Sequence, residues 1–144
     1  VERHHALMID PDIYLRALMH DVENAGGRIV QKSFETADDV FDLKEKLIFN
    51  CTGLGARDLF GDETLEPARG QLTMLLPQPE VDYGYVTSSP ETGLLYMFPR
   101  KSSILLGGSV DHGDWSLEPD ETERLRMLSG HAMMAQRIAD SQKA

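Results

Sequence analysis

The sequence lacks the features that cross-link a chain or hold it in a membrane. It has a single cysteine, Cys51, so an internal disulfide is excluded and the redox compartment is left open. No apolar run approaches the roughly 20 residues of a membrane-spanning helix, and no stretch has the pattern of a signal peptide. Lys and Arg are also scarce, 14 against 24 Asp and Glu, which gives a net charge of −10. This balance argues against nucleic acid and anionic membranes as partners, and a solvated acidic surface is its simplest explanation.

Size and composition are those of one globular domain. The 144 residues suffice for a core, and the hydrophobic content of 41% and charged content of 26% are ordinary for a soluble protein. The chain begins with Val1 rather than Met, and residues 140–144 end without a helix cap, so we expect a piece cut from a longer chain. We expect a cytoplasmic location, and export of a longer precursor stays open.

The common catalytic and phosphate-binding motifs are missing as well. The Gly-Leu-Gly at residues 53–55 is not a dinucleotide fingerprint, because the third glycine of GxGxxG would fall at Asp58. The histidines at residues 4–5 and the loop at 111–114 have metal-binding side chains, but a surface pair and a turn are the simpler interpretations. Cys51 ends an apolar run and is expected to be a small core residue rather than a nucleophile. We therefore predict no catalytic residue and no metal site.

Hydrophobic periodicity and turn residues predict several helices and strands. Asp10 and Pro11 are typical of a helix start, apolar residues follow at helical spacing, and Gly26 ends the pattern. A last helix should begin near Pro119. The expected strands are residues 28–34, 47–51, 71–76, 83–87, 94–98 and 103–108, with a loop or short helical turn at 36–45 and a helical turn at 56–60. The apolar face of the last helix is predicted to consist of Leu125, Leu128, Ala132, Ala135 and Ile138.

The two halves of the chain predict different sheets. Residues 47–51 are mostly apolar and lead into glycines, which is typical of a strand buried on both faces with a ligand at its carboxyl end. Residues 94–98 and 103–108 should instead form an antiparallel hairpin. Tyr96 and Phe98 would then share one face of the sheet. The predicted fold class is α+β (mixed α/β), with residues 1–76 mixed and residues 77–144 forming an antiparallel sheet and a C-terminal helix.

Several short motifs, taken in order, resemble one known family. They are Asn50-Cys51-Thr52-Gly53, Pro67-Ala68-Arg69-Gly70-Gln71, Tyr96-Met97-Phe98-Pro99-Arg100, Leu106-Gly107-Gly108 and Gly113-Asp114-Trp115-Ser116. Together they resemble the FAD-dependent amine and amino-acid oxidases of the D-amino-acid oxidase family, whose relatives include glycine and sarcosine oxidases. The likeness runs from about Asp10 to Ile138. It implies part of a Rossmann-like FAD domain plus an antiparallel substrate-domain sheet with flanking helices.

The resemblance also implies roles for individual residues. Phe34, Thr52 and Gly53 match positions that contact FAD, and Tyr96 matches a tyrosine whose hydroxyl binds the substrate carboxylate. The chemistry implied is hydride transfer from the substrate to the flavin, in which the protein supplies positioning and electrostatics. The sequence departs from the family near Thr92, where a second tyrosine would fall.

These points lead to two functional hypotheses. The main one is a portion of an FAD-dependent oxidoreductase that oxidises a small-molecule amine or amino acid. The resemblance places the Gly-rich FAD loop upstream of Val1 and the carboxylate-binding arginine beyond Ala144, so the chain alone is expected to be inactive and flavin-free. Unpaired strand edges and apolar surface favour a homodimer. The alternative is a non-catalytic binding or interaction module derived from the same fold.

Overall fold

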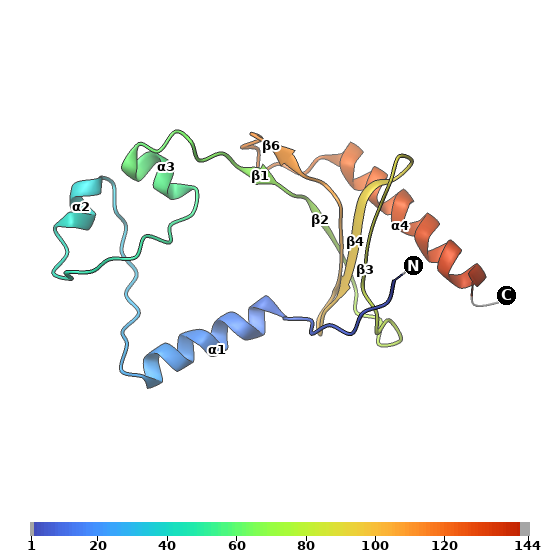
Figure 1. Cartoon of the computed structure of the whole chain (residues 1–144), viewed down its shortest axis with the longest axis horizontal. Helices are drawn as coiled ribbons and strands as arrows, with labels where there is room; N and C mark the ends of the chain where they lie inside the picture. Colours follow the sequence, from blue (N-terminus) through green and yellow to red (C-terminus); the bar gives the residue numbers. More distant parts are fainter. Residues whose placement is uncertain (1, 142–144) are drawn as a thin grey trace.

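A computed structural model describes residues 2–141 and contains helices and antiparallel strands (Figure 1). The helices are α1 (Pro11–Asn24), α2 (Ala37–Phe41), α3 (Gly55–Phe60) and α4 (Glu121–Ser141). The strands are β1 (Ala68–Arg69), β2 (Leu72–Leu75), β3 (Tyr85–Ser89), β4 (Gly93–Pro99), β5 (Ile104–Gly107) and β6 (Asp111–His112). The predicted mixed α+β class is confirmed.

Four strands form one antiparallel sheet in the order β2-β5-β4-β3. The predicted hairpin is the pair β4–β5, and its connection is closed by the Arg100 N–H, which donates to the Ser103 carbonyl at 2.7 Å. β2 lies before residue 77 yet belongs to the same sheet as the later strands. The predicted division of the chain between residues 76 and 77 stays a prediction. β1 and β6 pair separately as a short two-stranded ribbon that the sequence did not predict.

Helix α4 covers one face of this sheet. Met127 of α4 and Leu95 of β4 are both fully buried, and Met97, Ile104 and Leu106 form the core beside them. The helix approaches closely at Gly130, where a β-carbon would lie 2.8 Å from Leu95 Cδ1. The alternation of β4 places its inward residues on the face that α4 covers. On the opposite face no helix of residues 2–141 is packed (Figure 1).

The predicted apolar face of α4 was wrong in part: Leu128 packs against the core as expected, but the buried face is rotated away from several of the other predicted residues. Leu125 is 51% exposed, and Ala132 and Ala135 are exposed too, whereas the buried residues are Met127, Gly130 and His131. The reason is physical: a glycine permits close approach to the sheet, and a histidine is buried here because both ring nitrogens find partners. A count of apolar positions registers neither effect.

The first half of the chain departs furthest from the prediction. Residues 28–34 and 47–51 are extended but are not strands, and no segment within residues 2–141 pairs with them. Leu47 and Phe49 are 73% and 81% exposed, and Cys51 is exposed rather than in a core. An extended segment becomes a strand only when a neighbour satisfies its backbone N–H and C=O groups. The apolar residues favour a strand at 47–51, but no strand among residues 2–141 pairs with this segment.

The helices of this half follow their local signals. Asp10 caps α1 by accepting from the Asp12 N–H at 3.2 Å, and Gly26 ends it with φ of 86°. None of the residues of α1 is buried. Figure 1 shows α2 and α3 set apart from the four-stranded sheet, with one extended segment leading from α1 to α2 and another leading from α3 to β1. None of the helices in the described part of the chain is long and apolar enough to span a membrane.

Candidate functional site

Tyr96 lies on the face of the sheet opposite α4. Its ring stacks on that of Phe98, with ring centroids 5.4 Å apart and an interplanar angle of 26°, whereas Leu95 and Met97 are buried under the helix. The predicted division of β4 into two faces is therefore confirmed. Within residues 2–141 no hydrogen bond occupies the Tyr96 hydroxyl, which leaves it available to a ligand.

The ring of Tyr96 rests directly on Gly107. The two residues are cross-strand partners in β4 and β5, and a β-carbon at Gly107 would lie 2.2 Å from two ring carbons of Tyr96. At Gly108 a β-carbon would lie 2.1 Å from the Leu94 carbonyl oxygen. Real β-carbons do not approach atoms so closely, so the Leu-Gly-Gly motif has a packing reason: it lets the Tyr96 strand and ring lie against the backbone of β5.

The surroundings of Tyr96 on this open face are apolar and accessible. The strand register places Leu72 and Val86 in the same row as Tyr96 and Gly107, and Met74 in the next row, across Leu105 from Phe98. Val86 and Met74 are each 65% exposed. An apolar sheet face with one phenol hydroxyl suits a planar ring or the apolar part of a small ligand.

A hydrogen-bond chain reaches Gly107 from the other side of the sheet. The Tyr85 hydroxyl and His131 Nδ1 are 2.6 Å apart, and His131 Nε2 is 3.2 Å from the Gly107 carbonyl oxygen. Since a carbonyl can only accept, we assign the ring proton to Nε2, and Nδ1 then accepts from Tyr85. Burial lowers the pKa of His131, as does the nearby Arg126, against the opposing effect of the hydrogen bond to Gly107. Burial also raises the pKa of Tyr85 to about 12, so both groups are neutral at neutral pH.

Arg126 of α4 holds two further backbone carbonyls at this end of the sheet. Its Nη2 donates to the Gly108 carbonyl at 3.1 Å, and its Nη1 donates to the Thr92 carbonyl. Glu123 accepts from the other side of the same guanidinium. Neither Arg126 nor His131 was predicted from the sequence, because a single basic or aromatic polar residue inside a long helix has no distinctive spacing.

Thr92 occupies the place near which the family's second tyrosine was expected. It is buried, and its hydroxyl lies 2.9 Å from that of Ser89 and donates to the Gly93 carbonyl at 3.1 Å. Its side chain therefore closes the turn between β3 and β4 and does not reach the open face.

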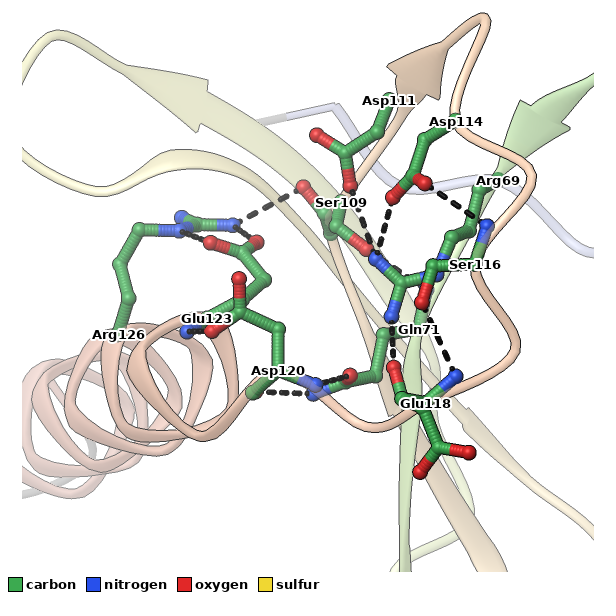
Figure 2. Close-up of polar contacts among 11 residues, drawn as sticks. Arg69, Gln71, Ser109, Asp111, Asp114, Ser116, Glu118, Asp120, Glu123 and Arg126 are labelled. Carbon is green, nitrogen blue, oxygen red and sulfur yellow. Dashed lines mark hydrogen bonds and ion pairs between the residues drawn. The ribbon is translucent and has the colours of Figure 1, made fainter.

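A polar cluster joins two of the motifs quoted above (Figure 2). Arg69 Nη1 donates to Asp114 Oδ2 at 3.0 Å and lies 3.8 Å from Asp111 Oδ2, while its Nη2 donates to the Glu118 carbonyl. The side chain of Arg69 is only 15% exposed, so these contacts are partly shielded from water. The cluster fixes the β1–β6 ribbon beside the start of α4.

Gln71 makes the next connection in the same cluster (Figure 2). Its amide nitrogen donates to the Asp120 carbonyl at 2.8 Å, and its amide oxygen accepts from the Asp120 N–H at 2.7 Å. The Asp120 carboxylate in turn accepts from the Glu123 N–H at 3.0 Å, as an N-cap does. The Pro-Ala-Arg-Gly-Gln motif thus anchors the first turn of α4.

The residues predicted to contact FAD lie elsewhere, around α2 and α3. Phe34 and Thr52 line one small, mostly apolar cavity of about 90 Å³. Asn50 Oδ1 accepts from the Thr52 N–H at 3.1 Å and from its hydroxyl at 2.7 Å, and Gly53 completes the turn with φ of 58°. Figure 1 shows this region well apart from β4, so the structure brings Phe34 and Thr52 together but not with Tyr96. Their roles toward FAD and substrate stay predictions.

Other chemistry is sparse in this part of the molecule. Within residues 2–141 no three His, Cys, Asp or Glu side chains are grouped so that they could hold a metal ion. The cavity beside Thr52 is also far below the roughly 300–1,000 Å³ of pockets that enclose small ligands. The cavity beside Thr52 is therefore too small to enclose a small ligand.

Comparison with known proteins establishes the family. A model of the family described as FAD dependent oxidoreductase matches residues 2–140. The chain belongs to this FAD-dependent oxidoreductase family. Among curated relatives, a D-amino-acid oxidase of Dictyostelium discoideum is 30% identical over 92% of the chain and 37% of that protein. A human D-aspartate oxidase is 34% identical over 81% of the chain and 33% of that protein.

A third relative, a D-amino-acid oxidase of Streptomyces coelicolor, is 32% identical over 78% of the chain and 34% of that protein. The chain thus spans about a third of the length of the curated relatives it matches. FAD is the cofactor of the family. Gly53 lies in an exposed turn, where a β-carbon would meet no atom within 4 Å, so this turn leaves room for a cofactor to approach the backbone.

Proposed function

We propose that this chain is part of a flavoenzyme that oxidises a small amine or amino acid. The observation that carries the proposal is Tyr96, whose hydroxyl stands on an open apolar face because Gly107 has no side chain beneath the ring. The relatives' names, D-amino-acid oxidase and D-aspartate oxidase, favour a D-amino acid among the possible substrates. Bound FAD supplies the hydride acceptor.

The chain's own residues bind and orient the substrate. The Tyr96 hydroxyl donates a hydrogen bond to the substrate carboxylate, and the stacked ring of Phe98 limits its movement. The apolar side chains of Leu72 and Val86 lie in the same row and offer the apolar part of the substrate a surface beside that bond. We propose that Phe34, Thr52 and Gly53 contact FAD from the α2–α3 region.

Replacement of Tyr96 by Phe tests the proposed substrate contact. A hydrogen bond to a charged group is worth about 1.5–3 kcal/mol, so in the longer flavoenzyme of which this chain is proposed to be part, kcat/KM should fall roughly 10- to 100-fold in Y96F. Tyr14→Phe is the matched control, because it removes a hydroxyl from the exposed side of α1. Equal kinetics in Y96F and wild type would remove Tyr96 from the substrate site.

For the 144-residue chain by itself we propose that it is inactive and retains no flavin. The support is that residues 47–53, the proposed cofactor edge, lie exposed and without a strand neighbour among the described residues. Purified chain that is yellow and releases FAD on denaturation would contradict this. A colourless chain that still binds a protein partner would favour the non-catalytic interaction module instead.

We also propose self-association of the chain. β2 and β3 are the edges of the sheet within residues 2–141, and large apolar side chains such as Met74 and Leu76 are exposed along one edge strand and just beyond it. Unpaired edges of this kind favour pairing with a second copy. Sedimentation that shows a monomer at high concentration would count against a homodimer.

A cytoplasmic location of the protein is a further proposal, which fractionation of cells tests.

A further inference from the structure

His131 connects helix α4 to the backbone on which Tyr96 rests. Its Nε2–H donates to the Gly107 carbonyl from the buried side of the sheet, and the Tyr96 ring lies on Gly107 from the open side. Gly107 is therefore held between a histidine on one face and a tyrosine on the other. His131 is buried, so water cannot replace its hydrogen bond.

The hydrogen bond from His131 to the Gly107 carbonyl lies where β5 ends, so it affects the position of the backbone there. Gly107 is the last residue of β5, and the chain leaves the sheet at Gly108 with φ of 154°. Gly107 is buried as well, so water cannot take the place of the imidazole N–H that its carbonyl accepts. Loss of the imidazole would therefore favour a shift of Gly107, and the ring of Tyr96 would move with its support.

Tyr85 fixes the imidazole that makes this contact. Its hydroxyl donates to Nδ1, which keeps the proton on Nε2 and sets the plane of the ring. Tyr85 lies in β3 and is the cross-strand partner of Met97, next to Tyr96 in β4. The chain of contacts from Tyr85 through His131 to Gly107 thus spans three elements that surround the Tyr96 strand.

We infer that His131 is a positioning residue for Tyr96, which sets the place of the Tyr96 hydroxyl by holding the Gly107 carbonyl from the α4 side of the sheet. The inference rests on the proposed role of Tyr96 in binding the substrate carboxylate. His131 touches neither substrate nor cofactor in this scheme. Its removal should weaken carboxylate binding while FAD binding stays as it is.

The test compares three replacements of His131 in the longer, FAD-containing protein of which this chain is proposed to be part, because the chain by itself is proposed to retain no flavin. Leu removes both hydrogen bonds at similar volume, Gln places an amide N–H near the position of Nε2, and Asn reaches only as far as Nδ1. The readout is the Kd of propionate, a carboxylate that cannot be oxidised, followed through the flavin absorption spectrum. We expect the Kd to rise roughly tenfold in H131L and H131N and to stay within about threefold of wild type in H131Q. Ala135→Gln, at an exposed position of the same helix, should change nothing.

A double-mutant cycle separates this inference from the proposed function. In the Y96F background, H131L should have no further effect on the Kd of propionate, because both changes act on one hydrogen bond. An equal effect of H131L with and without Tyr96 would overturn the inference, as would equal affinities of H131Q and H131N. If Y96F itself binds propionate like wild type, the proposed role of Tyr96 fails instead. If H131L does not fold, the comparison of Gln with Asn decides.

Discussion

Arg69 Nη1 lies 3.0 Å from Asp114 Oδ2, across 45 positions of sequence. This ion pair joins the Pro-Ala-Arg-Gly-Gln segment to the Gly-Asp-Trp-Ser segment, which were quoted from the sequence as separate motifs. Their joint presence now has a structural reason, since each supplies half of one contact. Trp115, the residue after Asp114, is in turn contacted by Arg57, whose guanidinium carbon lies 5.8 Å from the centre of the Trp115 ring.

Replacement of Asp114 by Asn should destabilise the protein. The change removes the shorter ion pair of the largely buried Arg69 and leaves the longer one to Asp111 and the hydrogen bond to the Glu118 carbonyl. We expect a loss of about 1.5 kcal/mol, the low end for hydrogen bonds to charged groups, because Asp114 is 37% exposed. Urea unfolding followed by circular dichroism measures the difference. Glu121→Gln breaks the exposed pair with Arg124 and should change the midpoint little. Equal effects of the two variants would show that the Arg69 cluster contributes no more than a surface pair.

Replacement of Gly107 by Ala should displace the Tyr96 ring. The new methyl group would lie 2.2 Å from the ring, so ring or strand must move, at a cost of about 1–3 kcal/mol. We expect a lower free energy of unfolding and a higher Kd for propionate in G107A. Gly55→Ala is the control, because its β-carbon would meet only Thr52 Cβ, at 4.0 Å, in the first turn of α3. A G107A protein with wild-type stability and affinity would contradict the close approach of Tyr96 to β5.

The buried His131 should make stability depend on pH in the acid range. Its pKa is lowered in the folded state, chiefly by burial, from an ordinary value of 6.5. Above pH 6.5 the imidazole is neutral in both states and contributes no pH dependence. Below it the unfolded chain binds a proton that the folded chain does not, so the free energy of unfolding falls as the pH falls. Urea unfolding between about pH 7 and pH 5 should show a shallower decline in H131Q than in wild type. Parallel curves would show that His131 titrates alike in both states.

Replacement of Thr52 by Val tests the proposed cofactor edge. The change removes the hydroxyl that donates to Asn50 Oδ1 at 2.7 Å and loosens the turn at Gly53. We expect weaker FAD binding in the protein, by roughly tenfold for one hydrogen bond, measured by titration of the apoprotein with FAD. Thr122→Val, at an exposed position in the first turn of α4, is the control. Unaltered FAD affinity in T52V would remove the Thr52 hydroxyl from the cofactor edge.

The sequence predicted the second half of the fold better than the first. β3, β4 and β5 have local signals, namely alternating residues and short turns, and these sequential antiparallel strands pair with one another, whereas β2 pairs with the more distant β5. Residues 47–51 have equally strong apolar content, but a strand there depends on neighbours that residues 2–141 do not provide. Local pattern predicts propensity, and pairing decides the outcome.

The candidate site, like the fold, could be predicted from the sequence only in part. Tyr96 could be named because it lies within a recognisable motif and because strand alternation assigns it to one face. His131 and Arg126 could not be named, because their roles depend on the packing of α4 against the sheet. The backbone carbonyls that they contact lie more than 15 positions away in sequence. The burial of a histidine is decided by tertiary partners, which no spacing in a single sequence reveals.

The paired hydrogen bonds between Gln71 and Asp120 have a consequence for the dynamics of the molecule. Gln71 directly precedes β2, and Asp120 directly precedes α4, 49 positions later in the chain. One amide side chain therefore ties an edge strand to the first turn of the helix that covers the sheet. Opening of that edge must break the anchorage of the helix at the same time. Hydrogen exchange would thus find the amides of β2 and of the first turn of α4 opening as one unit, with the fraying of the edge strand suppressed.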